Sequence, residues 1–368
     1  MRAHLLYITS LFFFFIPAHA QHVLSGKTLN DRNGSPISGV SIYFNNTSIG
    51  TLSNETGDFT LPGAIEGELI ISSVGFERII YKVGKEELGK RSFTFRLQPK
   101  EAILQDIMIM PDATRKKYLQ LFRENFLGIT EEADNSKITN MRAIYFVKPP
   151  GDKNGIIALS DTPLHIINRE LGYNIQFDLG EFYFNEKSGI TSFYGFTRYD
   201  EMRNKRRWQK NRRRAYYGST VHFFRSLISN RLAEEGYSIY KVQEDSIKQT
   251  GTSISIGSKT MSMAIPVKAT DIVKKDSSSG MYAASWGKKL MVQYHKKPAG
   301  RDYLARKVMV SGALPNGFRS YLNTEEKAVL IDENGLLENP LVVFFSGFWI
   351  YEKAANLLPY NYIPEKED

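Results

Sequence analysis

The chain has 368 residues, a formal net charge of +9 and no cysteine. Without cysteine it can form neither a disulfide framework nor a cysteine-based zinc site, so burial of a core must keep it folded. Its length is enough for about two domains. Frequent Tyr and Phe residues in alternating runs favour β structure.

The first twenty residues have the three parts of a secretory signal peptide. Arg2 supplies a positive charge, Leu5 to Ile16 form a largely apolar run, and Ala18-His19-Ala20 is a small-x-small cleavage signal. The run is shorter than the roughly 20 residues that span a bilayer core, and no later stretch is suited to span as a helix. We therefore expect residues 1–20 to be removed. The protein is then exported to the periplasm or the outer membrane, or secreted. With no cysteine after the cleavage site, we do not expect a lipoprotein.

Short alternating strands separated by turn signals occupy residues 21–98. Val40, Ile42 and Phe44 alternate with polar or amphipathic neighbours, which indicates a half-buried strand. Gly57 follows Glu55-Thr56 at a turn between two further strands. Six or seven such strands predict a small β-sandwich.

This segment resembles a known family. The matching residues, between Val23 and about Leu97, are Gly26, Pro36-Ile37-Ser38-Gly39-Val40, Gly50-Thr51, Gly57-Asp58-Phe59 and Ser73-Val74-Gly75-Phe76. They are similar to the carboxypeptidase-regulatory-like domain, a transthyretin-type sandwich of Bacteroidetes envelope proteins. Ser53-Asn54 stand where that family usually has Thr-Asp. The resemblance implies a seven-stranded accessory module without catalytic residues.

After a linker over residues 99–114, residues 115–368 are predicted to form an α+β domain, so that the whole protein is mainly β. Tyr118 and Phe122 recur at helical spacing in "DATRKKYLQLFRENFLG", and Gly128 ends that helix. An antiparallel sheet is expected from alternating runs at 172–199, 252–267, 288–296 and 303–312, with a hairpin turn at Asn334-Gly335.

The second part is also similar to the C-terminal region of short Bacteroidetes proteins that carry the same sandwich, although this companion domain implies no activity. The matching residues are Phe126-Leu127-Gly128, Asn168, Leu171-Gly172-Tyr173, Trp208, Asn211-Arg212, Tyr216, Gly218-Ser219, His222-Phe223, Leu227, Gly347-Phe348-Trp349 and Leu358-Pro359.

A strongly basic stretch, "RNKRRWQKNRRR", occupies residues 203–214. As a helix over 199–215 it has one uncharged stripe of Asn204, Trp208, Asn211 and Ala215. We expect this helix to dock through that stripe and to form a basic helix pair with a second helix that Ser219 caps. The expected structural anchors are Trp208, Arg212 and Tyr216. The candidate anionic-surface contacts are Arg203, Lys205, Arg206, Arg207, Lys210, Arg213 and Arg214.

Three interpretations of these cations are considered. They can be solvated or paired within the protein, or they can contact an anionic envelope surface such as lipid A, phospholipid or acidic glycan. A nucleic-acid partner is not expected, because export removes the chain from the cytoplasm and Trp208 is used for docking. If the surface interpretation is right, reversing Arg206, Arg207, Arg213 and Arg214 to Glu leaves the fold intact and abolishes membrane association.

Motifs for catalysis are missing from the sequence. The mature histidines lack the His-x-x-Glu spacing of a zinc carboxypeptidase, and we find no HExxH, Gly-x-Ser-x-Gly or phosphate-binding loop. His165 and His222 lie in apolar sequence and are expected to be core or interface residues. Paired carboxylates for glycoside cleavage remain open, with Asp178, Glu181, Asp200 and Glu201 near aromatic strands.

The sequence therefore predicts a non-catalytic envelope protein for interaction or assembly at the periplasmic or outer-membrane surface, with no cofactor or metal. Its partner would be an envelope protein or an anionic envelope surface. The alternative is a glycan-binding or glycan-processing protein that uses aromatic side chains and carboxylates of the second domain. A cleft there, lined by aromatics and two carboxylates, would favour this alternative.

Overall fold

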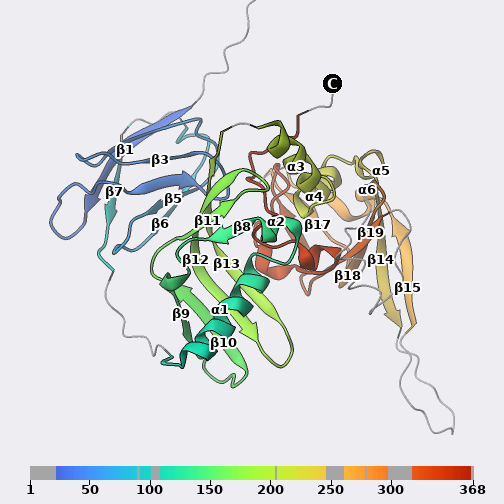
Figure 1. Ribbon diagram of the computed structural model, residues 1–368. Helices are drawn as coiled ribbons and strands as arrows, with labels where there is room; N and C mark the ends of the chain where they lie inside the picture. The colour runs from blue at the N-terminus through green and yellow to red at the C-terminus, as the bar shows by residue number, and fades with distance from the viewer. Residues whose placement is uncertain are drawn as a thin grey trace, which may run out of the picture. The chain divides into compact units, whose positions relative to one another are not determined.

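The computed structural model describes residues 22–88, 92–100, 108–203, 205–245, 261–277, 280–296 and 317–365. The expected signal peptide at 1–20 and the expected strand at 303–312 lie outside the described residues, as does the first part of the strand expected at 252–267. The chain divides into two units, Met1–Phe44 with Ile49–Pro99 and Asn45–Ser48 with Lys100–Asp368. Figure 1 labels many of their elements.

Among the described residues, no helix has both the length and the apolar character needed to cross a membrane.

The first unit is a sandwich of seven strands, as predicted. One sheet has the order β4-β1-β7 and the other β3-β2-β5-β6. β1 pairs antiparallel with β4 and parallel with β7, and the other pairs are antiparallel. The strands are β1 (Val23–Asn30), β2 (Ser41–Phe44), β3 (Gly50–Leu52), β4 (Asp58–Pro62), β5 (Gly67–Ser72), β6 (Ile79–Val83) and β7 (Phe93–Leu97).

The turn predicted at Gly57 is present and depends on glycine. Its φ is 78°, and an added Cβ would meet the carbonyl oxygen of Thr28. The core between the two sheets is aliphatic and aromatic, with Leu24, Ile42 and Leu61 fully buried. The alternation of apolar residues therefore predicted this unit well.

The second unit begins with one long helix on a six-stranded antiparallel sheet. The sheet has the order β8-β11-β12-β10-β9, and β13 pairs along the other edge of β12. Its elements are α1 (Asp112–Phe126), α2 (Glu131–Asp134), β8 (Ser136–Ile138), β9 (Ile144–Val147), β10 (Gly155–Ser160), β11 (Leu164–Asn168), β12 (Tyr173–Asn185) and β13 (Thr191–Glu201), with a 3₁₀ turn at Met141–Ala143.

Helix α1 confirms the prediction from helical spacing. It lies along one face of the sheet (Figure 1), and the ring of Phe122 lies 4.8 Å from that of Phe182 on β12. Phe126 packs edge-on against Phe177 at 4.9 Å. Gly128, with a φ of 97°, follows the last turn as expected.

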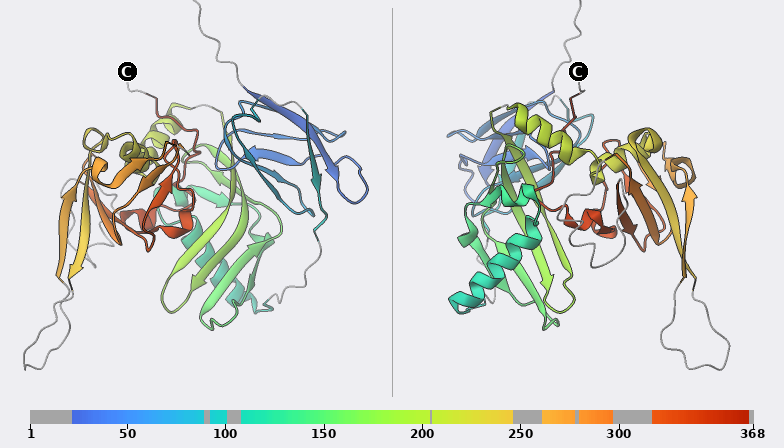
Figure 2. Two further views of the ribbon diagram at one scale, coloured as in Figure 1. Left: turned by 180° about the vertical axis from the view of Figure 1, so that it is seen from behind. Right: turned by 45° about the vertical axis from the view of Figure 1, so that its right-hand side comes forward.

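A second core in this unit forms on two further antiparallel sheets, β15-β14-β18-β19-β21 and β16-β17-β20 (Figures 1 and 2). Helix α4 begins at the cap Ser219, as predicted, and buries Phe223 against Tyr237 and Trp349. The elements are α4 (Thr220–Ile228), α5 (Leu232–Glu235), β14 (Tyr237–Asp245), β15 (Met261–Val267), α6 (Ala269–Ile272), β16 (Val273–Lys275), β17 (Tyr282–Ala284), β18 (Lys289–Tyr294), β19 (Phe318–Asn323), β20 (Val329–Ile331) and β21 (Phe344–Gly347), with 3₁₀ turns at Pro340–Val342 and Phe348–Tyr351.

The basic helix is shorter than predicted. Helix α3 runs from Arg206 to Tyr216, and the expectation that it starts at residue 199 was wrong. Residues up to Glu201 belong to β13, which pairs with β12 along its whole length. The ladder of backbone hydrogen bonds with β12 outweighs the helical spacing of the side chains. Asn204 of the expected stripe lies outside the described residues.

Candidate functional site

Helix α3 docks on the turn between β11 and β12 through side-chain donors. Trp208 Nε1 donates to the carbonyl of Arg169 at 2.8 Å, and Asn211 Nδ2 donates to that of Glu170 at 2.9 Å. Arg212 donates to the carbonyls of the next two residues, at 2.7 and 3.1 Å. Four consecutive carbonyls of the turn thus receive donors from one face of α3, and Ala215 on the same helix joins the apolar core of this unit.

The same turn explains why a tryptophan can lie so close to the backbone. Gly172 has a φ of 72°, a conformation that L side chains rarely adopt, and a Cβ there would overlap the indole ring of Trp208. Asn168, fully buried, accepts hydrogen bonds from the backbone N–H groups of Glu170 and Leu171 at 3.1 and 2.9 Å. The turn is therefore preorganised to receive α3.

The structure separates the predicted anchors from the predicted surface contacts. Trp208, Arg212 and Tyr216 are buried. Arg213 is half-buried, and the other six predicted contacts, Arg203, Lys205, Arg206, Arg207, Lys210 and Arg214, are exposed. Of these, Arg207 donates to the carbonyl of Arg169 at 3.2 Å, and Lys205 lies 5.0 Å from the ring centroid of Trp208.

Arg214 is an internal counter-ion, even though part of it is exposed. Its Nη2 lies 3.3 Å from Glu131, 3.4 Å from Glu132 and 3.2 Å from Glu170. Burial and the neighbouring Glu131 raise the pKa of Glu170. Three carboxylates around one guanidinium would repel each other without it. Reversing Arg214 is therefore expected to disturb this cluster, which makes the fourfold reversal a poor test of surface binding.

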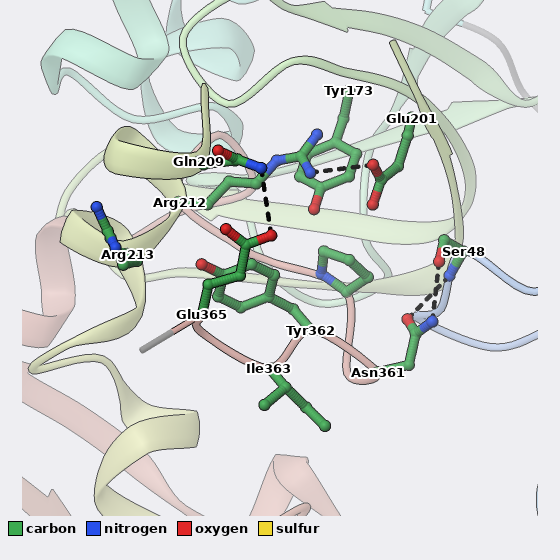
Figure 3. Close-up of a pocket in the computed structure, with 11 residues that line it drawn as sticks. Ser48, Tyr173, Glu201, Gln209, Arg212, Arg213, Asn361, Tyr362, Ile363 and Glu365 are labelled. Carbon is green, nitrogen blue, oxygen red and sulfur yellow. Dashed lines mark hydrogen bonds and ion pairs between the residues drawn. The ribbon is translucent and has the colours of Figure 1, made fainter. Parts of the chain in front are cut away.

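A pocket of about 280 Å³ opens beside α3 in the second unit. Its wall combines the start of β12, the end of β13, two turns of α3 and the segment 359–365. Figure 3 shows the side chains that line it. The residues that matter below are Tyr173, Glu201, Gln209, Arg212, Arg213, Tyr362 and Glu365.

Strand register brings two of these residues together. Tyr173 on β12 pairs directly with Glu201 on β13. Arg212 Nη1 reaches Glu201 Oε2 at 3.1 Å, and its guanidinium lies over the Tyr173 ring, 3.9 Å from the centroid. Gln209, one turn earlier on α3, donates to Glu365 at 3.2 Å. Cations and carboxylates are thus interleaved around the opening.

Arg225 on α4 fixes the segment 359–365. Its Nη2 donates to the carbonyl of Tyr360 at 2.6 Å and its Nη1 to that of Tyr362 at 3.0 Å. Its Nε donates to the carbonyl of Asn334 at 2.9 Å. One guanidinium therefore positions an irregular segment that has no secondary structure of its own, and with it one wall of the pocket.

Tyr173 carries an unusual hydroxyl. The residue is fully buried, and its hydroxyl has no hydrogen-bond partner in the described part of the chain. An unpaired buried polar group costs about 1–3 kcal/mol. Burial raises the pKa of Tyr173 and brings that of Tyr362 to about 12. Both hydroxyls therefore remain protonated at neutral pH and can donate a hydrogen bond.

The carboxylates considered for catalysis are dispersed. Among Asp178, Glu181, Asp200 and Glu201, only Glu201 lines the pocket. Asp178 is buried and Asp200 pairs with Arg198 at 3.0 Å. The second carboxylate of the pocket, Glu365, was not predicted, because nothing near it in the sequence indicates a site. Across the described ranges, no group of three or more His, Asp or Glu side chains is placed to hold a metal ion.

His222 is a satisfied core residue, as predicted, whereas His165 is exposed and so is not a core residue of this chain. The Gly218 N–H donates to His222 Nδ1 at 3.1 Å, and the Tyr237 hydroxyl lies 2.9 Å from the same atom. Nδ1 is thus the acceptor, and the proton is on Nε2, 3.2 Å from Glu235 Oε2. Both ring nitrogens serve the fold, so neither is available as a base.

This arrangement predicts a loss of stability in mild acid. Burial lowers the pKa of His222 below its usual value, against the opposing effect of Glu235. The unfolded chain therefore binds a proton near pH 6.5, where the folded chain does not. The free energy of unfolding should fall as the pH is lowered from about 6.5. In His222→Asn, whose overall stability is lower, this slope should be shallower in denaturant titrations at several pH values. An unchanged slope would assign the acid sensitivity to other groups.

Comparison with known families and structures gives one clear result. Residues 24–109 match the CarboxypepD_reg-like domain family. A search of curated proteins finds no match. Solved structures include a candidate carbohydrate-binding protein from Bacteroides uniformis, at 8% identity over 84% of this chain and 98% of that chain, with a TM-score of 0.17.

Two other structures are similarly distant. A candidate membrane-associated protein of unknown function from Bacteroides fragilis shares 8% identity over 85% of this chain and 94% of that chain, with a TM-score of 0.18. A 9R-lipoxygenase from Cyanothece shares 10% identity over 58% of this chain and 50% of that chain, with a TM-score of 0.17. At these values the structural matches support no conclusion about function. The family match and the seven-stranded sandwich together identify the first unit as a CarboxypepD_reg-like domain.

Proposed function

We propose that the protein is an exported, non-catalytic component of the cell envelope that binds a saccharide in the pocket beside α3. The observation that carries this proposal is the composition of the pocket. It combines the Tyr362 ring, the carboxylates of Glu201 and Glu365, and the unpartnered hydroxyl of Tyr173. Pockets with an aromatic surface and a few fixed polar groups suit ligands with many hydroxyls.

The two carboxylates are arranged for binding. Arg212 pairs with Glu201, and Gln209 donates to Glu365. Each carboxylate is thereby held as a hydrogen-bond acceptor in a defined position. Glycoside cleavage needs one carboxylic acid that donates a proton and a second carboxylate that acts as base or nucleophile. The contacts of Glu201 and Glu365 favour recognition of hydroxyl groups over such proton transfer.

Isothermal titration of the full chain with a panel of soluble saccharides tests this proposal. Gln209→Trp should fill the pocket and weaken binding at least tenfold. Gln120→Trp is a matched control, since Gln120 is also on a helix and donates to a glutamate, Glu124, at 3.0 Å. That variant should bind like the wild type. If the wild-type chain binds none of the saccharides, the proposed function is wrong.

A second candidate function is docking on an anionic envelope surface. It is favoured by three exposed cations, Arg203, Arg206 and Lys210, which have no hydrogen-bond or ion-pair partner in the described segments. Cations near such a surface contribute about 1 kcal/mol each. These three could therefore supply loose attachment, and the surface could be lipid phosphate or acidic glycan.

Charge reversal at the exposed residues tests this second function. Arg206→Glu with Lys210→Glu should weaken co-sedimentation with vesicles of anionic phospholipid at least tenfold, without a change in melting temperature. Lys116→Glu with Lys137→Glu is the control, because it changes the net charge equally at exposed sites on α1 and β8. Equal losses in both variants would indicate a general charge effect and argue against a specific surface.

A further inference from the structure

The hydroxyl of Tyr173 indicates where a ligand would bind. Its ring contacts the Arg212 guanidinium, 3.9 Å from the ring centroid, and the Tyr199 ring, whose centroid lies 5.5 Å away in an edge-to-face arrangement. Figure 3 shows the hydroxyl directed into the pocket. It is fully buried and has no hydrogen-bond partner among the described residues. A hydroxyl can donate one hydrogen bond and accept others, so a ligand oxygen there would satisfy it.

Arg212 and Glu201 form a rigid edge beside that hydroxyl. The guanidinium is fixed by the carbonyls of Leu171 and Gly172 and by the Glu201 carboxylate. The Arg212 side chain is 8% exposed, whereas that of Glu201 is 49% exposed. These contacts use three of the five guanidinium N–H groups, so two donors remain beside an acceptor that a ligand can reach. Two adjacent hydroxyls of a sugar ring offer the complementary pattern, since each can accept from the guanidinium and donate to the carboxylate.

The charges that line the pocket balance. Two arginines, Arg212 and Arg213, and two glutamates, Glu201 and Glu365, line it, and Arg212 is already paired with Glu201. An anionic ligand would lose hydration and meet two carboxylates, with no uncompensated excess of positive charge to attract it. The cations that give the sequence its basic character, such as Arg206 and Lys210, do not line the pocket.

We infer that the pocket selects a neutral sugar with two adjacent hydroxyls, which the Arg212–Glu201 pair and the Tyr173 hydroxyl bind together. This inference rests on the proposed saccharide-binding function and specifies its ligand. The volume of about 280 Å³ is at the low end for small-molecule pockets. The recognised unit is therefore one small ring, such as the terminal residue of a glycan.

Titrations with matched ligands test the ligand class. The probes are the methyl glycosides of neutral hexoses, the corresponding uronic acids, and deoxy analogues that lack one hydroxyl of the pair. The neutral glycoside should bind at least tenfold more tightly than its uronate, with little dependence on salt between low and physiological ionic strength. Removing one of the two hydroxyls should weaken binding about tenfold, or about 1.4 kcal/mol.

Tyr173→Phe tests the role of the hydroxyl. It should weaken binding of the neutral glycoside at least tenfold and raise the melting temperature, because it removes an unsatisfied buried group. Tyr183→Phe, also on β12, loses a hydrogen bond to Asp152 at 2.6 Å; it should lower the melting temperature and leave binding unchanged.

The outcomes separate the inference from the proposed function. Tighter binding of uronates, or unchanged binding by Tyr173→Phe, overturns the inference while saccharide binding stands. Absence of binding by every saccharide overturns both.

Discussion

Replacing Gly172 with alanine is expected to lower the free energy of unfolding of the second unit by about 3 kcal/mol. Two costs add up. The left-handed backbone conformation is unfavourable for alanine by about 1–2 kcal/mol, and the new methyl group would overlap the Trp208 ring at a cost of about 1–3 kcal/mol. The measurement is chemical denaturation, with tryptophan fluorescence and circular dichroism as separate probes.

Gly189→Ala is the matched control. Gly189 has nearly the same φ, 70°, but nothing lies within 4 Å of an added Cβ. It should therefore cost only the conformational strain, about 1–2 kcal/mol. If the free energy of unfolding falls equally in both variants, the close approach of Trp208 to the turn does not contribute to stability. The docking of α3 must then depend on other contacts.

Arg225→Met is expected to release the segment 359–365 and to abolish ligand binding. Its guanidinium donates to the carbonyls of Tyr360, Tyr362 and Asn334, and methionine would leave all three without that donor. Hydrogen bonds to a charged group contribute about 1.5–3 kcal/mol each, so we expect a loss of about 3 kcal/mol even if water replaces some of them. Arg225 does not line the pocket beside α3, so it acts on the ligand only by positioning the wall.

Hydrogen exchange gives a readout of this effect that needs no ligand. The backbone amides of Tyr360 and Tyr362 donate to the carbonyls of Asn46 and Pro359. They should exchange at least tenfold faster in Arg225→Met, while those of β12 should be unchanged. Arg231→Met is the control, because Arg231 is 57% exposed and pairs with the side chains of Glu234 and Glu235. Unchanged exchange in the segment would show that its position does not depend on Arg225.

Local sequence patterns predicted the parts of the fold that rest on local physics. Gly57 marked a turn that needs a positive φ, and Tyr118 and Phe122 marked the buried face of α1. The predicted start of α3 was wrong because the side-chain pattern of residues 199–201 is compatible with a helix and with a strand. These residues form a strand because they pair with β12. A predicted boundary is therefore wrong where a strand from another part of the sequence stabilises the competing structure.

The sequence predicted only part of the candidate site, for a related reason. Glu201 and Arg212 were named from sequence, but their pairing depends on the register of β12 with β13 and on the docking of α3. Glu365 contacts Gln209, and Arg225 contacts Tyr362. Each of these pairs is more than a hundred residues apart in the sequence. Of the eight cations in residues 203–214, seven were predicted as surface contacts and Arg212 as a structural anchor. Sequence cannot show that two of them, Arg212 and Arg214, are counter-ions within the fold.

The parallel pairing of β1 with β7 has a consequence for the order of folding. These strands come from opposite ends of the first unit, so the sheet that contains them closes only when the rest of the sandwich is present. Contacts between segments far apart in the chain carry a large entropy cost of loop closure and slow the folding rate. The first unit should therefore fold in a single late, cooperative step, without a stable intermediate made of its early strands alone.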